Sequence, residues 1–203
     1  MGEKTHAVSA KYQSPDDYIM SERQNPTRNE YVGGRVIPRS GSNRWHSLIV
    51  SNIAIAVGSR VHGGKNDIYI GNMRVRVKNN FICYPDVVIV AGEPSFADQA
   101  GDLLLNPTVV VELVSGATNY ADKTQKLESF LAMNSVKEVV LVKEDEMRIE
   151  HYAKQNAKQW IYKIYNERDD VLSLESAGCK VSLSEIYSQI KFGHAPLSST
   201  AVN

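Results

Sequence analysis

The sequence is poor in cysteine, has no long apolar run and carries no excess of charge of either sign. Its two cysteines, Cys83 and Cys179, lie far apart in the chain, which argues against a disulfide framework or a paired-cysteine metal site. No stretch approaches the roughly 18 apolar residues that a membrane helix needs, and the first twelve residues lack the apolar segment of a secretory signal. These absences argue against disulfide-rich secreted and membrane-spanning classes, and they predict a reducing cytoplasmic location.

Charge is balanced over the whole chain, with 23 basic and 23 acidic residues, but it is unevenly distributed. Residues 20–80 carry ten basic and three acidic residues, a net charge of +7, whereas residues 81–203 carry a net charge of −6. This polarity fits one face that attracts an anionic polymer. The alternative, which charge alone favours, is that both halves carry ordinary solvated surface charge.

The hydrophobic fraction of 42% provides enough apolar material for a core and excludes whole-chain disorder. Along the first 65 residues, Ser14-Pro15-Asp16-Asp17 predicts the start of a helix that ends before Asn25-Pro26. Gly33-Gly34 lies between two short apolar segments and predicts a tight hairpin. A longer helix is expected from Ser42 or Asn43 to Gly63-Gly64.

After residue 66 the pattern changes to strands. It predicts one strand from Asp67 to the turn at Asn79-Asn80, a second over 81–91 and a third over 108–115, with a surface loop over 92–107. A helix over 119–133 and a strand over 136–143 follow, and the remainder forms a small antiparallel appendage with strands over 147–153, 159–165 and 171–174. A capping box at Ser182 predicts a short closing helix. The expected fold is therefore α/β or α+β, a mixed sheet with packed helices in one domain over residues 1–192, and a disordered tail over 193–203.

Two carboxylates stand in unusually apolar surroundings. Asp86 interrupts the strand predicted over 81–91, and Glu112 interrupts a run of valines and leucine. A lone buried carboxylate costs several kcal/mol, roughly, unless a cation, a basic side chain or water at a strand end compensates it. Each acid alone fits a structural role as well as a ligand role. Because neighbouring strands lie about 5 Å apart, the pair also suits Mg²⁺, which uses one or two protein carboxylates.

Lys126 completes a candidate site from the helix that follows the Glu112 strand. It lies one turn beyond Asp122 and Lys123, at the edge of the apolar stripe formed by Leu127 and Phe130, so it can point toward the sheet. The alternative is an ordinary surface pair between Asp122 and Lys126.

These residues belong to motifs that resemble the Uma-two family, restriction-endonuclease-like proteins of the PD-(D/E)XK nuclease superfamily. The resemblance covers roughly residues 15–155 and is carried by the following segments: Arg28-Asn29-Glu30-Tyr31-Val32-Gly33-Gly34, His46, Met73-Arg74-Val75-Arg76-Val77, Tyr84-Pro85-Asp86, Val111-Glu112-Leu113-Val114-Ser115, Asp122-Lys123-Thr124-Gln125-Lys126 and Ser135-Val136-Lys137-Glu138-Val139-Val140-Leu141-Val142. It implies a restriction-endonuclease-like core, a mixed β-sheet flanked by helices, with an N-terminal helix and hairpin and a C-terminal antiparallel hairpin.

The resemblance also implies a metal site. It makes Asp86, Glu112 and Leu113 the ligands of Mg²⁺ or Mn²⁺, gives Lys126 the role of assisting the attacking water, and lets Glu30 bind or orient metal-bound water. Three positions depart from the pattern. The superfamily lysine is replaced by Val114, Ser115-Gly116-Ala117-Thr118 differs from the usual Ser-Pro-Ser-Thr, and Asn72 stands where an acid is common.

Contacts with a DNA substrate are expected from basic side chains and one histidine. The candidates are Arg35, Arg44, His46, Arg74, Arg76 and Lys123, with Arg39 as a further phosphate contact. His46 fits a helix cap as well as a phosphate contact, and alternation puts Arg74 and Arg76 on one strand face. The aromatic residues of the C-terminal hairpin fit base stacking, packing or a dimer interface; they are Tyr152, Trp160, Tyr162 and Tyr165.

The leading hypothesis is a metal-dependent endonuclease that hydrolyses DNA, with a homodimer as the form able to cut both strands. A second is a nucleic-acid-binding or assembly module that keeps the fold without efficient chemistry, which the neutral overall charge favours. A third, a two-carboxylate glycoside hydrolase, fits less well because it has no use for a lysine on a helix.

Overall fold

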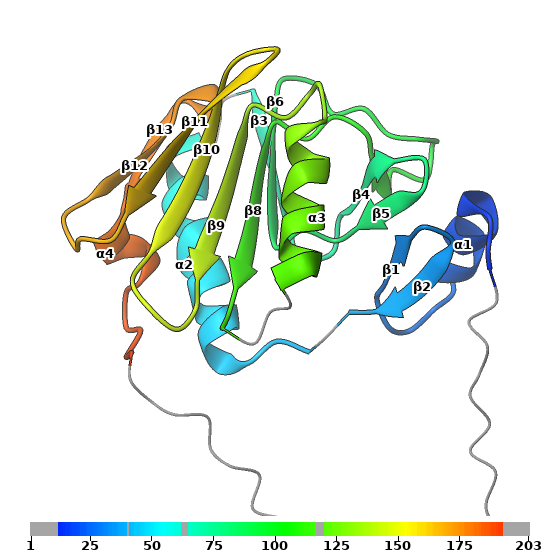
Figure 1. The fold of residues 1–203 in the computed structure, drawn as a ribbon, viewed down its shortest axis with the longest axis horizontal. Helices are drawn as coiled ribbons and strands as arrows, with labels where there is room; N and C mark the ends of the chain where they lie inside the picture. The colour runs from blue at the N-terminus through cyan, green and yellow to red at the C-terminus, as the bar shows by residue number, and fades with distance from the viewer. Residues whose placement is uncertain (1–11, 40, 62–64, 117–119, 193–203) are drawn as a thin grey trace, which may run out of the picture.

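A six-stranded mixed sheet forms the centre of the protein, with a helix on each face (Figure 1). The computed structural model describes residues 12–39, 41–61, 65–116 and 120–192, the side chains of residues 120–122 excepted. The order of the large sheet is β11-β10-β9-β8-β6-β3, and a smaller five-stranded sheet has the order β2-β1-β5-β4-β7. Strands β12 and β13 form a separate two-stranded sheet.

The elements have the following bounds. The helices are α1 (Pro15–Glu22), α2 (Arg44–Val61), α3 (Tyr120–Leu131) and α4 (Leu183–Ile186), with a 3-10 turn at Glu175–Ala177. The N-terminal strands are β1 (Asn29–Val32), β2 (Arg35–Pro38), β3 (Asn66–Ile70), β4 (Arg74–Lys78), β5 (Phe81–Cys83), β6 (Val87–Ala91) and β7 (Leu103–Leu104). The C-terminal strands are β8 (Val109–Val114), β9 (Glu138–Lys143), β10 (Ile149–Asn156), β11 (Gln159–Tyr165), β12 (Val171–Leu174) and β13 (Cys179–Ser182).

Strand β8 shows why the strands of the large sheet have nearly continuous apolar sequences. It runs parallel to β9 and antiparallel to β6, and α3 makes the crossover from β8 to β9. Val109 and Val111 pack in the core cluster with α2, whereas Val110 and Val114 pack in the cluster with Phe130 of α3. Successive side chains of a strand point to opposite faces, so a sheet covered on both faces is apolar at most positions, and Glu112 is the exception on β8. The predicted mixed sheet with packed helices is confirmed.

Local capping and turn signals placed several elements correctly. Ser14 caps α1 through its side chain, and Asn43 accepts hydrogen bonds from the first backbone amides of α2. Gly33 and Gly34 have φ values of 57° and 88°, the left-handed conformation that the predicted hairpin needs. Ser182 forms the predicted capping box. Three predictions, the end of α2 at Gly63-Gly64, the start of α3 at Asn119 and the tail from residue 193, fall outside the described residues.

Two predicted strands are each divided between the two sheets, which corrects the sequence-based boundaries. The chain leaves the large sheet after β3 at Gly71 and enters the small sheet with β4, and it returns between β5 and β6 through Tyr84-Pro85-Asp86. Gly71 has a φ of 65°, and Pro85 has no amide to donate to a ladder. The Gly71 amide donates to the Asp86 carbonyl over 2.9 Å, so both crossings lie together.

The segment 92–107, predicted as a plain surface loop, contains the short buried strand β7, which runs parallel to β4. An ion-pair network explains why this polar segment is held against the small sheet. Arg23 of α1 contacts Asp98 over 2.7 Å and Asp102 over 2.8 Å, and Arg74 of β4 contacts the same Asp102.

The predicted C-terminal hairpin is present, and it extends the large sheet instead of forming a separate appendage, because β10 pairs with β9. Its aromatic residues lie on both faces: Tyr152 and Tyr162 pack with ring centroids 4.9 Å apart, whereas Tyr165 lies near His151. Cys83 and Cys179 are buried free thiols. Among the described residues, no helix combines the length and apolar character needed to cross a membrane.

Candidate functional site

A cleft of about 920 Å³ opens where the two sheets meet. It is bounded by the β1–β2 hairpin, the first turn of α2, the end of β8 and the first half of α3. Most of the predicted site residues line it, together with residues that had no predicted role. The polar and charged lining includes Glu30, Arg35, Arg39, Asn43, His46, Asp86, Glu112, Ser115, Lys123, Gln125, Lys126 and Glu144.

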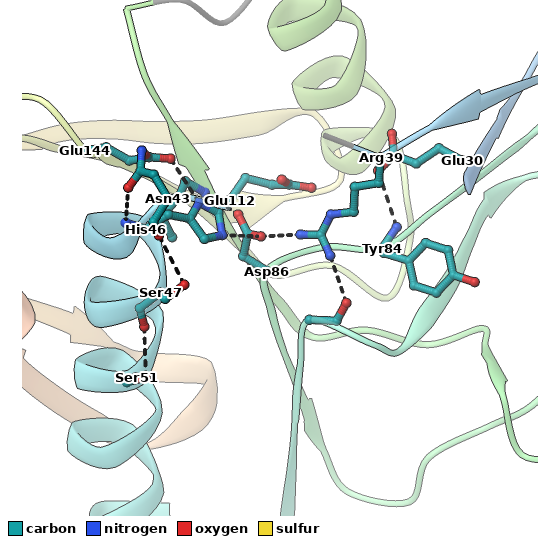
Figure 2. A network of polar contacts seen from close by, with 12 residues as sticks. Glu30, Arg39, Asn43, His46, Ser47, Ser51, Tyr84, Asp86, Glu112 and Glu144 are labelled. Atoms are coloured by element: carbon teal, nitrogen blue, oxygen red, sulfur yellow. Dashed lines mark hydrogen bonds and ion pairs between the residues drawn. The ribbon is translucent and has the colours of Figure 1, made fainter. Parts of the chain in front are cut away.

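Asp86 lies at the crossing between the sheets, just before β6, and its side chain is almost fully buried. Its Oδ2 accepts a hydrogen bond from the Leu113 amide over 2.8 Å. Its Oδ1 contacts the Arg39 guanidinium and lies 3.2 Å from His46 Nε2, with Arg39 and His46 on opposite sides of the carboxylate (Figure 2). Burial by itself would raise the pKa of Asp86, but the hydrogen bonds from His46 and Leu113 and the charge of Arg39 hold the pKa below its ordinary value.

Glu112 projects from β8 toward α3. It belongs to the same alternating set as Val110 and Val114, whose side chains pack on the α3 face of the sheet. The side chain is 8% exposed. Burial raises the pKa of Glu112 to about 7; the charge of Lys126 opposes that rise, while the charges of Asp86 and Glu30 add to it. Asp86 and Glu112 therefore interact electrostatically within one cleft.

Lys126 connects the two sheets through its ammonium group. Its Nζ donates to Glu112 Oε1 of β8 over 3.1 Å and to Glu30 Oε1 of β1 over 2.9 Å. Burial would lower the pKa of Lys126, but the charges of Glu112 and Glu30 raise the pKa above its ordinary value and keep the amine protonated. The predicted orientation toward the sheet is therefore observed. The side chain of Asp122, the alternative partner, lies outside the described residues.

His46 is held between two carboxylates, and one of them was not identified from the sequence. Its Nδ1 lies 2.9 Å from Oε1 of Glu144, a residue of the β9–β10 turn. Hydrogen bonds to Asp86 and Glu144 raise the pKa of His46 to about 9. Asn43 links the same Glu144 to the start of α2 over 3.2 Å. Glu144 stands in an acidic turn, Glu144-Asp145-Glu146, so no local pattern distinguishes it from surface charge.

The predicted phosphate contacts separate into two groups. Four of them line the cleft: Arg35, Arg39, His46 and Lys123. Lys123 also contacts Glu150 over 3.3 Å. Among the described residues, the other three candidates, Arg44, Arg74 and Arg76, do not line it. Arg44 lies over the Trp45 ring, with 4.1 Å between its Cζ and the ring centroid. Arg74 is buried and paired with Asp102, and Arg76 has a buried Nε, so these two residues do not form an exposed basic stripe.

The donor set of the cleft suits a hard divalent cation with few protein ligands. In the described part of the chain, no group of three or more His, Cys, Asp and Glu side chains is arranged as a metal site. The cleft places two buried carboxylates, Asp86 and Glu112, beside open volume. Mg²⁺ takes one or two carboxylates and fills its remaining positions with water and substrate oxygens, so this set is sufficient for it.

Comparisons with known proteins agree with this architecture. The chain is 26% identical over 155 residues to the protein named "Uncharacterized protein sll1609" of Synechocystis sp. (strain ATCC 27184 / PCC 6803 / Kazusa), covering 76% of this chain and 88% of that protein. It is 24% identical over 191 residues to "Uncharacterized protein slr1290" of the same organism, covering 92% and 98%. The crystal structure of "a putative nuclease belonging to DUF820" from Anabaena variabilis ATCC 29413 matches with a TM-score of 0.69 and 17% identity. That match covers 87% of this chain and 98% of the other, and it shows a shared nuclease-like fold.

The family comparison extends beyond the segments on which the resemblance rested. A family model described as "Uma2: Putative restriction endonuclease" matches residues 15–184. The match includes β10 to β13, which complete the large sheet and close its α2 face. Because it covers most of the sequence and all the residues that line the cleft, the chain belongs to the Uma2 family of restriction-endonuclease-like proteins.

Proposed function

We propose that the protein is a metal-dependent endonuclease that hydrolyses phosphodiester bonds of DNA. The observation that carries the proposal is the convergence of Asp86, Glu112 and Lys126, from a sheet crossing, a strand and a helix, in one cleft. A buried acid pair with a protonated amine beside it supplies ligands for a cation and a fixed positive charge for a phosphate.

Asp86 and Glu112 would hold Mg²⁺ or Mn²⁺, with the Leu113 carbonyl as the third protein oxygen. The cation, when bound, would polarise the phosphate and lower the pKa of a coordinated water. Lys126 stays protonated, so its role is to orient the attacking water and offset negative charge on the phosphoryl oxygens, not to act as a base. Glu30 shares the same ammonium and would keep it directed at the reacting water.

The remaining cleft residues would bind the DNA backbone. Arg35 stands at the cleft wall, and Lys123 stands there beside Glu150; both would contact phosphates. The proposal includes a homodimer, which would bring one such site to each strand of a duplex, with residues 1–192 of each chain as a single domain. Light scattering of the purified protein measures that state directly, and a monomer at working concentration would contradict it.

The test of catalysis is cleavage of supercoiled plasmid in the presence of Mg²⁺ or Mn²⁺. Glu112→Gln and Lys126→Met should each lower the rate at least about a hundredfold, the usual effect of removing a group that stabilises the transition state. Glu128→Gln, on the exposed side of α3, is the matched control and should cleave normally. Equal activity in the Glu112→Gln variant and the wild type would refute the assignment.

A second candidate function is a nucleic-acid-binding module without chemistry. It is favoured by the pairing of the cleft acids with basic groups, namely Asp86 with Arg39 and His46, and Glu112 with Lys126. Calorimetric titration with Mn²⁺ separates the two functions. Binding that is lost in Asp86→Asn supports the enzyme, whereas DNA binding without any metal binding supports the module.

A further inference from the structure

We propose that Arg39 is an exchangeable counter-ion of Asp86: it occupies the carboxylate when no divalent cation is bound, and moves to a nucleic-acid phosphate when a cation takes its place. The inference rests on the proposed function, since it concerns the same carboxylate. It adds a role for a residue that contacts Asp86 from the β1–β2 hairpin side of the cleft (Figure 2).

Both oxygens of Asp86 already have partners. Oδ2 accepts the Leu113 amide, and Oδ1 is shared by the Arg39 guanidinium and His46 Nε2. The side chain of Asp86 is 4% exposed, so water has little access to it. A cation that binds Oδ1 must therefore displace one of the two groups that share this oxygen.

His46 is the group that is held in place. It lies in the first turn of α2, and its second ring nitrogen contacts Glu144, which Asn43 also binds. The His46 amide donates to the Asn43 side chain over 2.9 Å. The ring is therefore fixed by its helix, by the helix cap and by Glu144.

The Arg39 side chain is held less firmly than the His46 ring. It directly follows the edge strand β2, and its one other side-chain hydrogen bond among the described residues runs from Nη1 to the Gly71 carbonyl over 2.8 Å. Its side chain is 23% exposed and lines the cleft. A long arginine side chain can swing into the cleft without moving the backbone. A guanidinium cannot lose its proton to relieve repulsion, so a divalent cation at Asp86 must push it away.

The displaced guanidinium would then face the cleft that the DNA backbone occupies. Arginine binds phosphate oxygens through two parallel hydrogen bonds, which makes phosphate a good replacement for the carboxylate. A phosphate that draws Arg39 away would open Asp86 to the cation, and a cation that releases Arg39 would strengthen phosphate binding. Linkage requires the two effects to be equal. Arg39 would thus suppress cation binding until nucleic acid is present.

The experiment measures cation affinity and arginine accessibility in the full chain without nucleic acid. Calorimetry with Mn²⁺ compares the wild type with Arg39→Gln and with Arg35→Gln, which removes the same charge from the same cleft without a contact to Asp86. We expect Arg39→Gln to bind Mn²⁺ about tenfold more tightly, a typical coupling between two sites, and Arg35→Gln to stay near the wild-type affinity. Arg39→Lys, which keeps the charge on a different head group, should fall between wild type and Arg39→Gln and serves if Arg39→Gln does not fold.

Phenylglyoxal labelling followed by mass spectrometry gives the second readout. Mg²⁺ should raise the labelling rate of Arg39 several-fold, while Arg74, buried against Asp102, should label slowly with and without Mg²⁺. The inference alone is overturned if the wild type binds Mn²⁺ and cleaves DNA but Arg39→Gln binds no more tightly, if Arg35→Gln tightens binding equally, or if Mg²⁺ leaves Arg39 labelling unchanged. No Mn²⁺ binding by any variant would overturn the inference and the proposed function together.

Discussion

Replacement of Lys126 by methionine should destabilise the protein because it leaves the buried carboxylate of Glu112 without its cationic partner. The substitution removes the ammonium that contacts Glu112 over 3.1 Å and Glu30 over 2.9 Å. Removing one partner of a fully buried pair costs about 3–5 kcal/mol. Glu112 is nearly buried, but the Lys126 side chain is 26% exposed. Solvent screening at such a pair lowers the expected loss of unfolding free energy to about 2 kcal/mol.

A double-mutant cycle isolates this interaction from the loss of the lysine side chain itself. In the Glu112→Gln background, Lys126→Met leaves no buried charge unpaired at position 112, so its cost should fall to about 1 kcal/mol or less. The assay is urea unfolding followed by circular dichroism, in EDTA and at pH 8, where Glu112 with a pKa of about 7 is ionised. Additivity of the two substitutions within about 0.5 kcal/mol would refute the contact.

Three further predictions concern other parts of the protein. Phe130 is fully buried between α3 and the large sheet, so Phe130→Ala should lower the unfolding free energy by about 3–5 kcal/mol in urea titrations. Burial would raise the pKa of Glu138, but hydrogen bonds from His151 and Ser176 lower the pKa below its ordinary value of 4.5. Near that pH the unfolded chain therefore binds more protons than the folded protein, so the unfolding free energy should fall as the pH drops below about 4.5. Glu138→Gln should remove this pH dependence. Arg35→Ala should weaken DNA binding, measured by fluorescence anisotropy at several salt concentrations. Arg74→Ala removes the buried partner of Asp102 and should instead lower the melting temperature of the protein.

Several features of the site followed from the sequence because they depend on neighbouring residues. An acid within an apolar strand, such as Asp86 or Glu112, needs a compensating charge in any fold that buries the strand. The helical position of Lys126, beside the buried stripe, directed it at the sheet. The distinction between Arg39, which contacts Asp86, and Arg74, which contacts Asp102, had no such local signal.

The sequence by itself determined the helix start at Ser14, the second helix start to within Ser42 or Asn43, the hairpin at Gly33-Gly34 and the two acids in apolar surroundings, because caps, turns and periodicity act within a few residues. Only the tertiary structure decided where strands cross between sheets and which charges meet. Arg39 and Asp86 lie 47 positions apart, Lys126 and Glu30 lie 96 apart, and His46 and Glu144 lie 98 apart. Such pairs are fixed by the packing of helices and sheets from distant parts of the chain, and no window of neighbouring residues contains that information.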